Sequence, residues 1–186
     1  MTLLVILALV YRNSALRCCK EIPMRYRDCP TVEVSERIVG DAAEIWAVVT
    51  DITLPVRFSA ELQKVEWLDG ADHAVVGARF RGYNKHPALG EWHTDCRVVE
   101  VEEPTRWVWE VEGDAGASAT WGFEVDPTSD GAIVRQWGRM GPGRSGLSLA
   151  IAARPEKEGR IVARRLTEWE AGMRANLAGI KALIEH

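Results

Sequence analysis

Acid–base chemistry is the reaction type for which this sequence offers side chains, with Glu61 and His93 as the leading candidates. A general acid or base needs a titratable group held in a water-poor pocket. Two further carboxylates, Glu110 and Glu124, lie in strand-like segments, where alternation puts them on the face opposite their aromatic neighbours, which we expect to meet solvent. His93 follows Trp92, so only one of the two can point inward, and we expect that to be Trp92.

Nucleophilic, metal and nucleotide chemistry have little support. The chain has no Gly-x-Ser-x-Gly elbow, and Cys96 lies three residues from His93, on the opposite strand face. Cysteines at positions 18, 19, 29 and 96 form no zinc spacing with the histidines at 73, 86, 93 and 186. Gly141, Gly143 and Gly146 match a dinucleotide fingerprint formally, but no further strand follows to complete a βαβ unit, so we interpret them as a turn. We therefore expect no metal and no cofactor.

Hydrogen-bonding side chains could instead orient a ligand in an apolar pocket, where a few polar groups are usual. Asn84, Arg79 and Gln136 are the candidates. The alternative for Arg79 is a solvated face opposite Phe80. The strand that holds Gln136 has charge and an aromatic residue on its other face, so its direction stays open.

The composition is that of a soluble globular protein with one domain. The chain has 186 residues, and Asp and Glu outnumber Lys and Arg by 27 to 23, for a formal net charge of -4. A nucleic-acid-binding protein would normally have a continuous block of basic residues, and this sequence has none. We therefore expect no nucleic-acid partner. The cysteine pattern favours free thiols in a reducing compartment, which predicts a cytoplasmic protein.

Residues 1–30 form an N-terminal extension before the domain at 31–186. Leu3–Val10 is an apolar run, too short for a bilayer span of about 20 residues. The nearest basic residues, Arg12, Arg17 and Lys20, come after this run, whereas a secretory signal has its positive charge before the apolar run. It is a weak membrane-surface anchor, an apolar element packed on the domain, or an upstream stretch before a true start at Met24, which we favour.

Short apolar alternations separated by turn residues predict seven strands. They are Thr31–Ile38, Lys64–Leu68, Gly77–Asn84, Glu91–Val101, Arg106–Glu112, Ser118–Val125 and Ala132–Met140. Short connections imply antiparallel pairing. Between the first two strands we expect a helix capped by Asp41 and a second short helix over Val56–Leu62.

A long helix is predicted for Glu156–Glu185, after Pro155. Apolar residues recur there at steps of three and four, which is typical of one buried stripe. The stripe is Val162, Leu166, Trp169, Met173, Leu177, Ile180 and Ile184.

From Thr31 onward the element order and several local patterns resemble the polyketide cyclase/dehydrase-like branch of the START/Bet v 1 superfamily, also called SRPBCC. The matching segments are Ala43-Glu44-Ile45-Trp46, Glu66-Trp67-Leu68-Asp69-Gly70, Gly77–Gly82, Asn84, Trp92, Cys96–Glu100 and Trp107–Val111. Many relatives have Trp-Ser-Pro-Glu where this chain has Phe58-Ser59-Ala60-Glu61. Arg144–Glu158 is longer and more apolar than the pattern, so it could form a lid.

The resemblance implies an α+β helix-grip fold, in which a curved seven-stranded antiparallel sheet wraps a long C-terminal helix around a cavity. Members of the superfamily bind lipids, sterols, polyketides and other apolar molecules, and some are cyclases or dehydratases. We expect a binder of a small apolar ligand, as a monomer or homodimer without an integral membrane span. The expected wall is Phe58, Phe80, Asn84, Trp92, Trp107, Trp109, Trp121, Trp169 and Met173.

Two other classes of function stay open. One is an enzyme of the cyclase/dehydratase type, with Glu61 or His93 as proton carrier and Asn84 orienting a carbonyl. The other is a protein interaction module with a solid core and no ligand.

Overall fold

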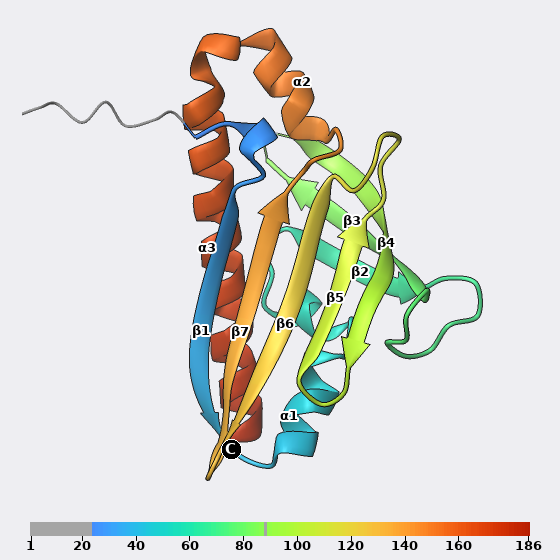
Figure 1. Ribbon diagram of the computed structural model, residues 1–186, viewed down its shortest axis with the longest axis vertical. Coiled ribbons are helices and arrows are strands. Elements are labelled where there is room, and N and C mark those ends of the chain that lie inside the picture. The colour runs from blue at the N-terminus through green and yellow to red at the C-terminus, as the bar shows by residue number, and fades with distance from the viewer. Residues whose placement is uncertain (1–23, 88) are drawn as a thin grey trace, which may run out of the picture.

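One antiparallel sheet of seven strands forms the centre of the computed structural model, which describes residues 24–87 and 89–186 (Figure 1). Its strands are β1 (Thr31–Val39), β2 (Leu62–Trp67), β3 (Arg79–His86), β4 (Gly90–Glu102), β5 (Arg106–Val111), β6 (Ala119–Thr128) and β7 (Gly131–Met140). Their order across the sheet is β1-β7-β6-β5-β4-β3-β2, and every neighbouring pair is antiparallel. The predicted sheet is therefore confirmed.

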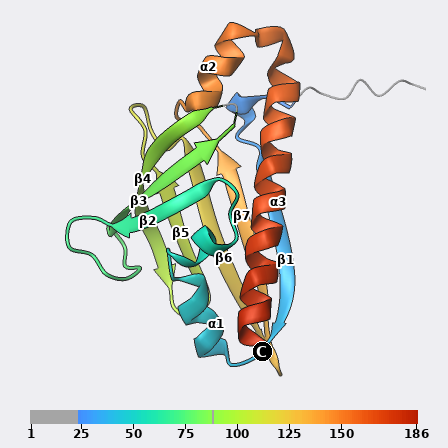
Figure 2. The ribbon, with the colours of Figure 1, turned by 180° about the vertical axis from the view of Figure 1, so that it is seen from behind.

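Helical elements precede, interrupt and follow the strands. They are η1 (Tyr26–Asp28), α1 (Ala42–Val49), η2 (Leu54–Arg57), α2 (Gly146–Ala153), η3 (Pro155–Lys157) and α3 (Glu158–Ile184). Asp41 caps α1 by accepting hydrogen bonds from the backbone of Ala43 and Glu44, at 2.9 and 3.1 Å. Figure 2 shows α3 running along the sheet beside β1, with α1 near its C-terminal end. The predicted helix-grip architecture is confirmed.

The long helix α3 packs its apolar stripe on the sheet. The buried residues on this helix are Val162, Leu166, Met173, Asn176, Leu177 and Ile180. Ile38, Val125 and Val134 of the sheet are also fully buried in the core. Full burial of one large apolar side chain contributes about 1.5–3 kcal/mol, so this stripe supplies much of the force that holds α3 in place.

A second short helix between β1 and β2 is present as predicted, but it begins earlier and is shorter than the range Val56–Leu62. A single 3-10 turn, η2, occupies Leu54–Arg57, and β2 begins at Leu62. The Ser59 hydroxyl accepts hydrogen bonds from the backbone N–H groups of Glu61 and Leu62, at 3.1 and 2.8 Å. These bonds replace the helical ones, because serine competes with the backbone ladder at such positions.

In the described part of the chain, no helix is both long enough and apolar enough to cross a membrane. The expectations for the apolar run Leu3–Val10 and for a start at Met24 concern residues 1–23, which lie outside the described residues.

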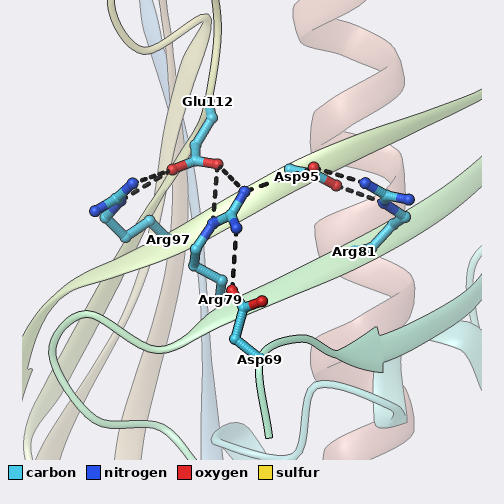
Figure 3. A network of polar contacts seen from close by, with 6 residues as sticks. All are labelled: Asp69, Arg79, Arg81, Asp95, Arg97 and Glu112. Carbon is cyan, nitrogen blue, oxygen red and sulfur yellow. Dashed lines mark hydrogen bonds and ion pairs between the residues drawn. The ribbon is translucent and has the colours of Figure 1, made fainter. Parts of the chain in front are cut away.

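Ion pairs cover the outer face of the sheet (Figure 3). Arg81 holds Asp95 through two bonds of 2.5 and 2.7 Å. Arg79 reaches Glu112 at 2.7 Å, and Arg97 binds the other oxygen of that carboxylate. Hydrogen bonds from the arginines hold the pKa values of Asp95 and Glu112 below their ordinary range. The Arg79 side chain therefore lies on the outer face of the sheet. It does not line a pocket, which was one of the two possibilities left open by the sequence.

Two tryptophans lie over glycines of the neighbouring strand, one on each face of the sheet. Trp121 of β6 pairs with Gly138 of β7, and Gly122 pairs with Trp137. A Cβ at Gly138 would lie 2.6 Å from the Trp121 ring, and one at Gly122 would lie 2.6 Å from the Trp137 ring. These positions need glycine because the ring of the partner occupies the space of a side chain.

Candidate functional site

A cavity of about 230 Å³ lies between the inner face of the sheet and α3. Strand alternation turns one side chain in two toward it, so β3 to β7 each contribute to the wall. The apolar lining is Val49, Ile52, Pro55, Leu62, Val65, Phe80, Trp107, Trp109, Val111, Trp121, Phe123, Trp169 and Met173. The core of this fold is therefore hollow rather than solid.

Stacked aromatic rings form the sheet side of the wall. Trp107 and Trp109 of β5 stack with centroids 4.3 Å apart, and Phe123 of β6 lies 6.3 Å from Trp107. Trp107 donates its ring N–H to the carbonyl of Val49 at 3.0 Å, so its one polar atom is satisfied inside the core. This part of the wall is therefore apolar and held in place by ring packing.

The helix side of the wall adds one more aromatic contact. Trp169 of α3 meets Trp121 of β6 with ring centroids 4.3 Å apart. Because Trp121 is fixed over Gly138, this contact ties the cavity side of α3 to the sheet.

A cluster of charged side chains lines one part of the cavity. It links Glu61, just before β2, to Arg165 and Glu168 of α3. Arg165 grips Glu61 through two bonds of 2.5 and 2.7 Å and reaches Glu168 at 3.2 Å. The Arg165 side chain is only 14% exposed, and that of Glu61 is 27% exposed. His86 of β3 lies 3.9 Å from Glu168.

Hydrogen bonds favour the charged forms of two members of this cluster, Arg165 and Glu168. Burial acts against the charge of Arg165, but its hydrogen bonds to Glu61 and Glu168 outweigh burial and raise its pKa. Burial also works to raise the pKa of Glu168, yet hydrogen bonds from Arg164 and Arg165 hold that pKa below its ordinary value. A carboxylate with a lowered pKa stabilises the fold above its unfolded-state pKa and loses that contribution as the pH falls through the folded value. Arg165 and Glu168 therefore carry their charges at neutral pH.

Amide groups provide a second polar patch deeper in the wall. Asn176 donates to Gln136 at 3.4 Å, and both side chains are buried. Within the described residues, the Oδ1 atom of Asn176 is buried and has no hydrogen-bond partner. Buried polar atoms are nearly always paired in folded proteins, so this acceptor requires a donor from a ligand or a water. The structure thus settles the direction that the sequence left open, with Gln136 facing inward.

Most of the residues predicted for the wall lie in it. Seven of the nine line the cavity, namely Phe80, Asn84, Trp107, Trp109, Trp121, Trp169 and Met173. Phe58 lines a small neighbouring pocket of about 10 Å³ instead. Trp92 pairs with Asn84 and shares the strand face of Thr94 and Cys96, but the cavity wall does not include it.

The two candidate proton carriers, Glu61 and His93, lie on opposite faces of the sheet. Glu61 lines the cavity, with both of its oxygens held by Arg165. His93 pairs with Tyr83, and their rings lie 6.3 Å apart on the outer face, which also bears Arg81 and Asp95. The structure therefore brings only Glu61 to the cavity.

Sequence reasoning missed the polar residues that α3 contributes. Arg165, Glu168, Gly172 and Asn176 line the cavity at steps of three and four, beside the apolar stripe. That spacing was itself a signal, because residues at these steps share one face of a helix. The ion pair between Arg165 and Glu61 could not be predicted from the sequence, because the two residues are 104 positions apart.

Cys96 lines the cavity but is unsuited to nucleophilic work. Burial raises the pKa of its thiol to about 12, so it stays protonated at neutral pH, and only the thiolate reacts readily. With iodoacetamide at pH 8, we expect Cys96 to stay unmodified in the folded protein and to react in urea. Cys29, a half-buried free thiol, is the internal control in peptide mapping. Equal labelling of the two cysteines in the folded protein would contradict this assignment.

Comparison with protein families gives one match over nearly the whole domain. The family model described as polyketide cyclase / dehydrase and lipid transport matches residues 30–185. No curated protein matches the chain significantly.

Solved structures share the fold. The Polyketide_cyc-like protein Cgl2372 from Corynebacterium glutamicum is 24% identical, with a TM-score of 0.62 over 88% of this chain and 94% of that one. The di-domain ARO/CYC StfQ from the steffimycin biosynthetic pathway is 13% identical, with a TM-score of 0.65 over 86% of this chain and 52% of that one. The chain thus spans about half the length of that di-domain protein. At these identities the likeness shows the fold alone.

Proposed function

Because the chain belongs to the polyketide cyclase / dehydrase and lipid transport family, we propose that its cavity binds a small amphipathic molecule with an apolar body and one polar end. The observation that carries this proposal is the cavity itself, with its aromatic walls and the buried amide oxygen of Asn176, which has no hydrogen-bond partner among the described residues. A protein interaction module with a solid core would not keep such a space, because empty apolar cavities cost stability.

The cavity volume bounds the size of the ligand. An engineered apolar cavity of roughly 150 Å³ holds one benzene ring. The space of about 230 Å³ therefore suits a molecule of roughly two fused rings, or a branched chain of similar bulk.

The lining bounds the chemistry of the ligand. Its body would lie on Trp107, Trp109 and Trp121, where offset stacking adds to apolar burial. We expect a hydroxyl on the ligand to donate to the unpartnered Oδ1 atom of Asn176. A purely apolar molecule of the same size would leave that acceptor unsatisfied and bind less tightly.

Calorimetric titration with 2-naphthol and naphthalene tests this proposal. Both molecules have two fused rings, but only 2-naphthol carries a hydroxyl. We expect 2-naphthol to bind with roughly fivefold or greater advantage, in keeping with one net hydrogen bond of about 1 kcal/mol. An absence of binding by both would refute the proposal at this size of ligand.

An enzyme of the cyclase or dehydratase type is the second candidate, because Glu61 reaches the cavity. Both carboxylate oxygens of Glu61 already accept hydrogen bonds from Arg165, which is why binding comes first. The cytoplasm is the proposed compartment, since Cys29 and Cys96 are free thiols.

Glu61→Gln separates the two functions, with His93→Ala as a control on the outer face. For a binder, we expect both variants to hold 2-naphthol within about threefold of wild type, since neither change removes apolar wall. Any compound that copurifies with the protein should also be recovered chemically unchanged after incubation. Conversion of that compound by wild type and His93→Ala, but not by Glu61→Gln, would instead establish the enzyme.

A further inference from the structure

The unpaired cations of this protein gather at one end. Among the described residues, almost every arginine and lysine forms an ion pair, contacts an aromatic ring or donates to a hydroxyl. The exceptions in that part of the chain are Arg25, Arg144, Arg154, Lys157 and Arg160, which are all exposed.

These five residues surround α2. Arg144 directly precedes the N-cap of α2, Arg154 is its C-cap, and Lys157 and Arg160 flank the start of α3. Arg25 belongs to the same place, since the next residue, Tyr26, donates its backbone N–H to Glu158 at 3.0 Å. Figures 1 and 2 both show η1, α2 and the start of α3 together at one end of the molecule.

The charge of this end differs from that of the whole protein. The chain has a formal net charge of -4, yet cations outnumber carboxylates by about two to one over residues 24–29 and 141–161. Two of the carboxylates are engaged, Asp28 by Arg27 at 3.8 Å and Glu158 by the Tyr26 backbone. The end therefore carries a positive field on an acidic protein.

Apolar side chains of α2 accompany the cations. Leu147 and Ile151 pack inward on the small cluster formed by Met140, Val162 and Leu166. Leu149 points the other way and is 68% exposed, the most exposed of the large apolar side chains in the described residues. Its neighbours Ala150, Ala152 and Ala153 are also exposed.

From this combination we propose that the α2 end docks on a membrane surface rich in anionic lipid, with Leu149 inserted and the five cations at the headgroups. Exposed leucine beside clustered cations matches an interface that is apolar below and negative above. A nucleic acid would satisfy the cations but would leave Leu149 in water.

Docking there would place the cavity close to the lipid. Trp169 packs against the same cluster as Leu147 and Ile151, and it also lines the cavity. Arg165, one turn earlier on α3, belongs to the charged part of the cavity. A bilayer that holds α2 would thus lie beside the charged part of the cavity at Arg165. The docking itself does not depend on what the cavity binds.

Cosedimentation of the full chain with lipid vesicles tests the proposal. We expect binding to vesicles of phosphatidylcholine with 30% phosphatidylglycerol and little binding to pure phosphatidylcholine. The triple variant Arg154→Glu, Lys157→Glu, Arg160→Glu should bind at least roughly a hundredfold more weakly, since the loss of three cations costs about fivefold each and the new carboxylates repel the lipid. Leu149→Ser should lose roughly tenfold, from the buried apolar area alone.

A charge-matched control reverses three cations toward the opposite end of the molecule, in the triple variant Arg37→Glu, Arg174→Glu, Lys181→Glu. It should bind vesicles within about threefold of wild type, because its charges lie away from α2. Thermal unfolding by circular dichroism verifies that each variant is folded. Equal losses in the two triple variants, or no loss in either, would overturn the proposal. So would binding to poly(U) RNA without binding to anionic vesicles.

Discussion

Gly172→Phe is expected to abolish binding of small molecules in the cavity while leaving the fold intact. Gly172 lies on α3 in the cavity wall, and a Cβ there would meet no atom within 4 Å. The phenyl ring is about as large as the benzene that fills a cavity of roughly 150 Å³, so it would take most of the 230 Å³. We expect the affinity for 2-naphthol, measured by calorimetry, to fall by tenfold or more.

Gly172→Ala is the matched control for that variant. Its methyl group removes little of the cavity, so 2-naphthol should bind within about threefold of wild type. Glycine costs about 0.5–1 kcal/mol relative to alanine within a helix, so we expect this variant to unfold at higher urea concentration than wild type. Wild-type affinity in Gly172→Phe would show that small molecules bind elsewhere.

Gly138→Ala is expected to lower the free energy of unfolding by about 1–3 kcal/mol, the usual cost of overpacking. The new methyl group would lie 2.6–2.7 Å from carbons of the Trp121 ring, and a rigid ring of this size yields only by moving as a whole. The displaced ring would shift from Trp169 and narrow the cavity. We therefore expect weaker binding of 2-naphthol along with lower stability in urea unfolding.

Gly122→Ala separates the two effects of that change. It creates the same crowding, at 2.6 Å from the Trp137 ring, but on the outer face of the sheet. We expect a similar loss of stability with unchanged affinity for 2-naphthol. Equal loss of affinity in both variants would mean that the strain acts through the whole sheet rather than through Trp121.

Period-two and period-3.6 patterns made most of the fold predictable. The alternation of Trp107, Trp109 and Val111 predicted the inner face of β5, because every second side chain of a strand faces the same way. The stripe of α3 likewise predicted which side packs on the sheet. The second short helix ends earlier than predicted, because the Ser59 hydroxyl accepts a hydrogen bond from the Leu62 backbone N–H and so replaces a helical bond.

The site was predictable only as far as its apolar wall. The direction of Trp137 stayed open, because it shares a strand face with two arginines. In the structure it lies on the outer face, with the Arg106 guanidinium 5.7 Å from its ring. The charged part of the cavity depends on contacts such as Arg165 with Glu61, whose partners are brought together by the fold and not by local spacing.

Native mass spectrometry of gently purified protein, with and without added 2-naphthol, tests most directly whether the cavity is a ligand site. We expect a wild-type species with a defined extra mass, either copurified or acquired from 2-naphthol, which organic extraction then identifies. Gly172→Phe should carry no such mass. Identical spectra of bare protein for wild type and Gly172→Phe, before and after addition of 2-naphthol, would contradict the account.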